Sequence, residues 1–67
     1  MSVAKVTEIS AGSPESFEHA VKLGLERAAK TLHNVRSAWI KEQSVLVSEG
    51  RVKEFRVNMK VTFVLED

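Results

Sequence analysis

The chain has 67 residues and a mass of 7.5 kDa, which leaves room for one small domain, residues 1–67. It has no cysteine, which excludes thiol catalysis, disulfides and cysteine-ligated zinc and is typical of a reducing compartment. A formal net charge of +1 favours neither nucleic acid nor a membrane surface as a partner. No apolar run has the length of a signal peptide or a spanning helix, so we expect a soluble cytoplasmic protein.

A strand and a helix are predicted in the first half of the chain. The β-branched run Val3–Ile9 is typical of a short strand. The segment Ser10–Glu15 holds a turn glycine and a serine placed to accept amide hydrogen bonds, and Pro14 within it is predicted to be the first helical residue. Apolar residues then recur at intervals of three or four and predict a helix that ends at about His33–Asn34. This apolar stripe comprises Phe17, Ala20, Val21, Gly24, Leu25, Ala28, Leu32 and Val35.

Two strands are predicted in the second half. Alternation from Arg36 to about Ser48 indicates the second strand, and Glu49–Arg51 supplies a glycine for a hairpin with a bulge or a longer turn. The clearest alternation runs over Val52–Glu66 and predicts a third strand with one apolar face toward the helix. The apolar face carries Phe55, Val57, Met59, Val61, Phe63 and Leu65, and the polar face carries Glu54, Arg56, Asn58, Lys60 and Thr62.

The order β-α-β-β predicts an α+β domain in which a three-stranded antiparallel sheet wraps on one long helix. Its third strand would span about 50 Å, whereas a compact domain of this length is only about 28 Å across. The sheet would also leave open edges and a second face that nothing covers. We therefore expect the chain to form a homo-oligomer.

Polar and aromatic residues on the uncovered face of the sheet are the candidate ligand contacts. The only tryptophan, Trp39, falls on this face by parity and offers a rigid surface for a planar ligand or for another subunit. Arg56 offers charged hydrogen bonds to a polar ligand or to acidic groups of another subunit. For each candidate residue, contact with a ligand and contact with another subunit both remain open. The candidates are Trp39, Ser37, Lys41 and Gln43 on the second strand and Arg56, Asn58 and Lys60 on the third.

Other chemistry has weaker support in the sequence. His19 and His33 would lie about 21 Å apart along the helix, too far to bind one metal ion within one chain. No Ser-His-acid order, phosphate-binding glycine loop or HExxH spacing is present, so we expect no enzyme. Acidic residues from several chains could still gather around a symmetry axis and bind a divalent cation. They are Glu8, Glu42, Glu49 and Glu54.

Several segments resemble dodecins, a family of small flavin-binding proteins. The similar segments are Lys5–Ile9, Gly12–Pro14, Arg27–Leu32 and Val52–Val57, and the likeness covers nearly the whole chain. The resemblance implies a β-α-β-β protomer and a hollow dodecamer, which agrees with the expected length of the third strand. It also implies binding of a flavin such as riboflavin or FMN.

The sequence departs from the family pattern at two positions. Dodecins that bind flavin stack it on a tryptophan just after the helix and bond it with a glutamine on the third strand. Ser37 stands where that tryptophan would be, Arg56 stands where that glutamine would be, and Trp39 lies two residues further on. The segment Arg36–Gln43 is more similar to a flavin-poor branch of the family, for which cation binding has been proposed.

Two functions follow from these features. The leading interpretation is a non-enzymatic, dodecin-like homododecameric shell that stores or buffers a small ligand such as a flavin. Its ligand contacts would include Trp39, Arg56, Ser37, Lys41 and Asn58. The alternative is a flavin-independent structural or cation-binding assembly in which the same residues join subunits.

Overall fold

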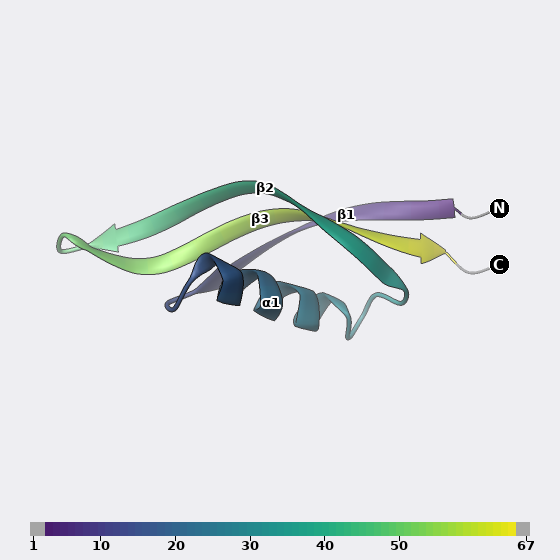
Figure 1. Ribbon diagram of the computed structural model, residues 1–67, viewed down its shortest axis with the longest axis horizontal. Helices are drawn as coiled ribbons and strands as arrows, with labels where there is room; N and C mark the ends of the chain where they lie inside the picture. Colours follow the sequence, from purple (N-terminus) through teal and green to yellow (C-terminus); the bar gives the residue numbers. More distant parts are fainter. Residues whose placement is uncertain (1–2, 66–67) are drawn as a thin grey trace.

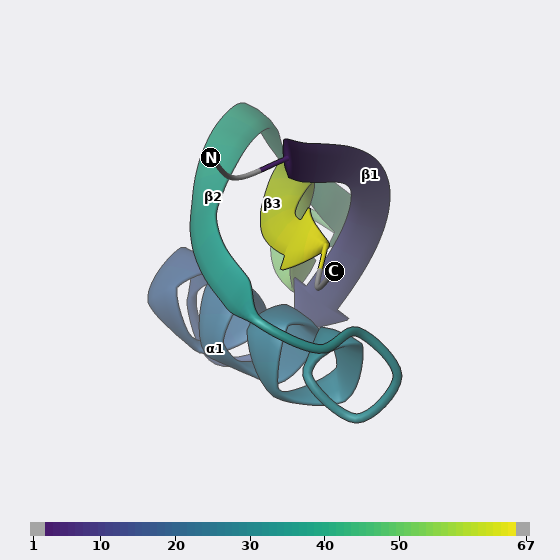
Figure 2. The ribbon, with the colours of Figure 1, turned by 90° about the vertical axis from the view of Figure 1, so that its right-hand side faces the viewer.

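The computed structural model describes residues 3–65 and has the predicted α+β architecture. Its elements are β1 (Val3–Ser13), α1 (Phe17–Ala28), β2 (Val35–Ser48) and β3 (Arg51–Leu65). The three strands form one antiparallel sheet in the order β1-β3-β2, so the last strand is central (Figure 1). The helix covers only one face of this sheet, and the two edge strands curve to either side of β3 (Figure 2).

The core lies between α1 and the predicted apolar face of β3. Its fully buried side chains are Ala20, Val57, Met59 and Val61, and Phe17 packs edge-on against Phe55 at 5.1 Å between ring centroids. Gly24 allows the helix to approach closely, since a Cβ there would lie 2.6 Å from Met59 Cε and 3.0 Å from Ala11 Cβ. The stripe residues within α1 therefore face the sheet, whereas Leu32 and Val35, expected on the same helix, lie beyond its end.

The helix is shorter than the sequence predicts at both ends. It begins at Phe17 rather than Pro14, because Ser16 is the N-cap and its hydroxyl accepts a hydrogen bond from the His19 amide at 2.9 Å. It ends at Ala28, after which the chain turns through Leu32, whose amide still donates to the Ala28 carbonyl. His33 thus lies outside the helix, and the helical spacing expected between the histidines was wrong.

The strand boundaries also differ from the sequence-based expectations. β1 continues past Ile9 to Ser13, because it stays paired with β3 as far as Phe55. The β2–β3 hairpin has a two-residue connection in which Glu49 and Gly50 both have positive φ, +53° and +75°, typical of a type I′ turn rather than a longer one. β3 begins one residue early, at Arg51, and its expected last residue, Glu66, lies outside the described residues.

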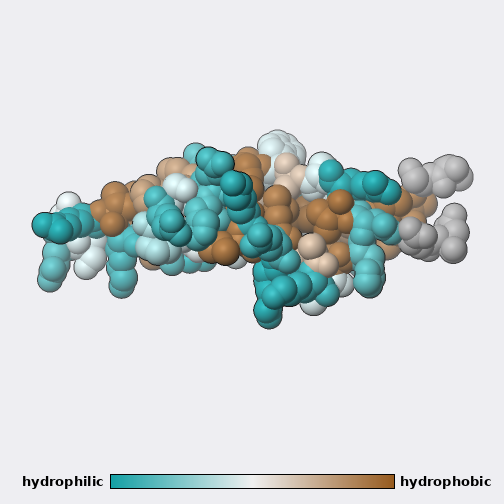
Figure 3. All heavy atoms as spheres, turned by 60° about the horizontal axis from the view of Figure 1, so that its bottom comes forward, coloured by the Kyte–Doolittle hydropathy of each residue, from teal (hydrophilic) through white to brown (hydrophobic). Residues whose placement is uncertain are grey.

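The protomer is elongated, with principal extents of 51 × 19 × 13 Å. Its radius of gyration is 13.8 Å, whereas a compact chain of this length would have about 11 Å. The β2–β3 hairpin extends beyond the N-terminal end of α1, and the far ends of β1 and β3 extend beyond the other (Figure 1). Hydrophobic atoms reach the surface toward both ends of the long axis (Figure 3). Among the exposed apolar side chains are Val45, Leu46, Val47 and Val52 of the hairpin and Val3, Val6 and Leu65 at the other end.

Within residues 3–65, no helix has the length and apolar character needed to cross a membrane.

Candidate functional site

The candidate ligand contacts lie on the face of the sheet that α1 does not cover, which we call the outer face. Residues paired across antiparallel strands point to the same side, and successive residues point to opposite sides. Met59 and its partners Ile9 and Ile40 pack in or against the core, so the next row, which is Lys60 with its partners, points outward. The outer face consists of the rows Val6–Thr62–Ser37, Glu8–Lys60–Trp39, Ser10–Asn58–Glu42 and Gly12–Arg56–Ser44.

A β-bulge at Lys41 changes the parity of β2. Ile40 pairs with Met59 and Glu42 pairs with Asn58, so Lys41 is the extra residue. Residues beyond the bulge therefore exchange faces: Glu42 joins the outer face, whereas Gln43 pairs with the buried Val57 on the helix side. The prediction that Gln43 shares a face with Trp39 was wrong for this reason.

Polar side chains of the outer face are joined by hydrogen bonds and ion pairs across the strands. The Lys41 ammonium spans the sheet to the Glu8 carboxylate of β1 at 3.3 Å. The Arg56 guanidinium donates to Glu54 Oε2 at 2.8 Å and to Ser10 Oγ at 2.9 Å. Separately, Asn58 Nδ2 donates to Glu42 Oε1 at 3.0 Å. Most charge on this face is thus balanced within the protomer.

Gly12 makes room for the Arg56–Glu54 pair. A Cβ at this position would lie 2.7 Å from Glu54 Cδ and 2.8 Å from Arg56 Nη1. Both side chains therefore lie directly over the backbone of β1, and the guanidinium is held by a carboxylate and a hydroxyl. Arg56 is positioned firmly but its charge is already compensated.

Trp39 is the most exposed large hydrophobic side chain among residues 3–65, with 68% of its surface accessible. The Lys60 ammonium lies over its ring at 5.7 Å from the centroid, within the range of a cation–π contact. Ser37 and Thr62 are paired in the next row of the same face. An indole surface is therefore available beside one ammonium group and two hydroxyl-bearing residues.

The structure brings the five predicted contacts onto one face but not into one cluster. Ser37 and Trp39 are two positions apart on β2. Lys41 lies at the bulge, and Asn58 lies in the row after the bulge. Arg56 is four positions from Lys60 on β3, which corresponds to about 14 Å along the strand from the Trp39 row. Within one protomer, Trp39 and Arg56 do not form a single site. Lys60, a candidate from the sequence that was not among the five contacts of the leading interpretation, is the residue in contact with the indole.

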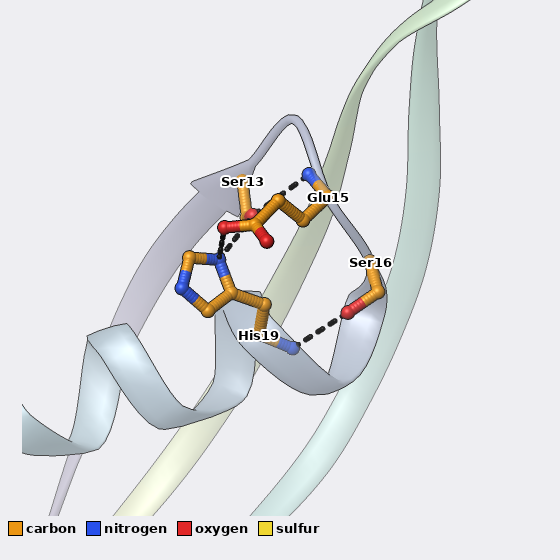
Figure 4. A network of polar contacts seen from close by, with 4 residues as sticks. All are labelled: Ser13, Glu15, Ser16 and His19. Carbon is orange, nitrogen blue, oxygen red and sulfur yellow. Dashed lines mark hydrogen bonds and ion pairs between the residues drawn. The ribbon is translucent and has the colours of Figure 1, made fainter.

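A second polar network joins β1 to the start of α1 (Figure 4). The Ser13 hydroxyl lies 2.6 Å from His19 Nδ1 and accepts a hydrogen bond from the Glu15 amide, and the Glu15 carboxylate lies 3.1 Å from the same ring nitrogen. A catalytic triad requires the serine and the acid on opposite ring nitrogens and an accessible serine. Here both meet Nδ1 and Ser13 is fully buried, so the network stabilises the strand–helix junction.

A concavity lies on the helix side, between β1 and α1. It is an open groove of about 450 Å³, and most of its lining residues are apolar or small, among them Ile9, Ala11, Leu23, Gly24, Ala28 and Leu32. None of the predicted ligand contacts lines it. No group of three or more His, Cys, Asp or Glu side chains within residues 3–65 is arranged to hold a metal ion.

Known proteins share the sequence pattern and the β-α-β-β fold of this chain. The family model for dodecins matches residues 3–66, nearly the entire chain. The chain belongs to the dodecin family. It is 37% identical over 65 residues to the dodecin of Thermus thermophilus, an alignment that covers 97% of this chain and 94% of that protein. The structure of dodecin from Streptomyces davaonensis superposes with a TM-score of 0.95 at 33% identity, covering 98% and 97% of the two chains. The resemblance noted in the sequence is thereby confirmed.

A second type of dodecin is also similar. The calcium dodecin of Mycobacterium tuberculosis is 33% identical over 63 residues, which cover 94% of this chain and 89% of that protein. Its crystal structure, described as having a novel calcium-binding site, superposes with a TM-score of 0.84 at 31% identity and covers 96% and 91% of the two chains. The chain is thus similar both to proteins named dodecin and to a calcium dodecin.

Proposed function

We propose that the protein is a non-enzymatic, dodecin-like homododecamer that binds a small planar ligand, such as riboflavin or FMN, by stacking it on Trp39. The observation that carries this proposal is the exposed indole on the outer face, far from the apolar core. A tryptophan with 68% of its surface accessible leaves a large apolar area in water, and stacking a planar ring would cover it. Storage or buffering of the ligand in the cytoplasm is the role that we assign to this site.

Assembly supports the same proposal from the shape of the protomer. The hairpin and the opposite end of the sheet expose apolar side chains beyond the reach of α1. A second copy would cover these side chains and would bring outer-face residues of different chains close together. Arg56, about 14 Å from the Trp39 row within one protomer, would then contact a ligand held on Trp39 of another copy. Lys41 and Asn58 lie nearer to Trp39 and would complete the set of ligand contacts.

Native mass spectrometry of the purified protein with riboflavin or FMN tests the assembly and the ligand in one spectrum. We expect dodecamers that carry flavin. Replacing Trp39 by Ala should weaken flavin binding by about 1–3 kcal/mol, the usual contribution of one stacked ring, whereas Trp39→Phe should retain part of it. A Trp39→Ala variant that binds flavin with unchanged affinity would contradict the stacking role.

A divalent cation is the second candidate, and the similarity to calcium dodecin favours it. Glu42 and Asn58 provide carboxylate and amide oxygens side by side on the outer face, and copies around a symmetry axis would add to them. Glu8 and Glu54 are less suited because each faces a cationic side chain. Calorimetric titration with Ca²⁺ distinguishes the candidates: Glu42→Gln should abolish calcium binding and leave flavin binding intact.

A further inference from the structure

Resting on the stacking role of Trp39, we propose that the planar ligand is an anion. Its oxyanion would be received by the Lys60 ammonium and by the hydroxyls of Ser37 and Thr62, while its ring system covers the indole. A phosphate-bearing ligand would then be preferred over the same ring system without charge. The argument depends on the charges around the indole, on the hydroxyls next to it and on the contact that a ligand must displace.

Lys60 is an unpaired cation in contact with the Trp39 ring within residues 3–65. Lys41 is bonded to Glu8 and Arg56 to Glu54, but no carboxylate within residues 3–65 forms an ion pair with Lys60. Glu8 is its partner in the register, yet the Glu8 carboxylate is engaged by the Lys41 ammonium that crosses the sheet. Among the side chains of residues 3–65 the Lys60 ammonium lies over the indole ring and forms no ion pair, so its charge remains available to a ligand.

The side chains around this ammonium determine where an anion would lie. Toward the hairpin, the next outer-face residue of β2 is Glu42, whose carboxylate would repel an anion. In the other direction the row consists of Val6, Thr62 and Ser37, which bring two hydroxyls and no charge. Adjacent rows on one face are about 7 Å apart and paired strands are about 5 Å apart. One oxyanion on this side would therefore be within reach of the ammonium and both hydroxyls.

The cation–π contact makes the choice of ligand dependent on charge. An uncharged ring that stacks on the indole face under Lys60 must displace the ammonium. The ammonium then loses its cation–π contact and gains no ion pair. An anionic ligand would displace the same contact but pair with the ammonium afterwards. Lys60 thus disfavours neutral planar ligands and favours anionic ones at the same surface.

Titration of the assembled protein with FMN and with riboflavin tests this inference, because the two share one ring system and differ in the phosphate. At about 0.01 M ionic strength, one exposed ion pair should give FMN roughly a fivefold tighter binding. The preference should shrink toward unity at about 1 M ionic strength, where exposed charges are screened. Lys60→Gln should abolish the preference and leave riboflavin binding equal or tighter. Ser37→Ala should weaken binding of FMN alone.

Lys53→Gln is the matched control, because it removes the same charge from an exposed position of β3 near the hairpin, far from Trp39. It should retain the preference for FMN. Equal affinities of the unmodified protein for FMN and riboflavin would overturn the anion inference, and so would a preference for FMN that survives Lys60→Gln. If both flavins still bind and their binding depends on Trp39, the stacking function remains intact. Binding of neither flavin would overturn both. Native mass spectrometry of each variant verifies that it is assembled.

Discussion

The exposed apolar tip of the β2–β3 hairpin should be required for assembly, and Val47→Asp is the sharpest test. Val47 is paired with Val52 at this tip and keeps 62% of its surface accessible in the isolated protomer. Complete burial of a valine side chain stabilises by about 1.5 kcal/mol or more, so burying the remaining part in an interface should contribute about 1 kcal/mol per subunit. A buried, unpaired aspartate would add a desolvation cost of several kcal/mol.

The expected result is dissociation at concentrations where the unmodified protein is assembled. Loss of the apolar contact alone, about 1 kcal/mol, weakens each contact roughly fivefold, and the desolvation cost of the aspartate adds to it. A closed assembly suffers this loss at every subunit. Sedimentation velocity over a range of concentrations measures the change. Ser48→Asp adds the same charge at the next residue, without removing apolar surface, and should leave the assembly largely intact. A Val47→Asp protein that sediments as the unmodified one would refute the assignment of this tip to an interface.

Three further substitutions test the fold that supports the site. Met59→Ala should lower the free energy of unfolding by about 2–5 kcal/mol, because the side chain is fully buried at the centre of the core, and chemical denaturation would reveal a smaller effect if the cavity collapsed. Ser16→Ala should cost about 1 kcal/mol by removing the helix N-cap, visible as a lower thermal midpoint, and no change would argue that another group caps α1. Gly12→Val should displace the Arg56–Glu54 pair from β1. Its crystal structure would show the guanidinium moved, and an unmoved pair would contradict the close approach described for Gly12.

The overall architecture was accessible from the sequence because its strongest signals are periodic. The apolar alternation of β3 and the stripe of α1 both predict burial, and Val57, Met59, Val61 and Ala20 are buried as expected. The helix boundary was missed because Ser13 and Ser16 are both plausible caps. Tertiary pairing decides between them: Ser13 is held in β1 opposite Phe55, which leaves Ser16 as the cap.

The composition of the site was less accessible, and the reason is the register. Parity correctly places Ser37 and Trp39 on the outer face, but it cannot detect an extra residue such as Lys41, after which every assignment on β2 is inverted. The pairing of Trp39 with Lys60 depends on the same register, and no local signal in the sequence indicates it. From the sequence alone, a lysine on the polar face of a strand cannot be distinguished from any other solvent-exposed charge, because its neighbours depend on the partner strand.

The extended shape of the protomer has a consequence for how the protein unfolds. Its accessible surface is 5097 Å², whereas a compact monomer of this mass would expose roughly 4,250 Å². The excess, roughly 850 Å², is close to the area that one partner contributes to a standard protein–protein interface. Folding alone does not bury this area, so in the proposed assembly we expect association to supply part of the stability. The thermal midpoint should therefore rise with protein concentration.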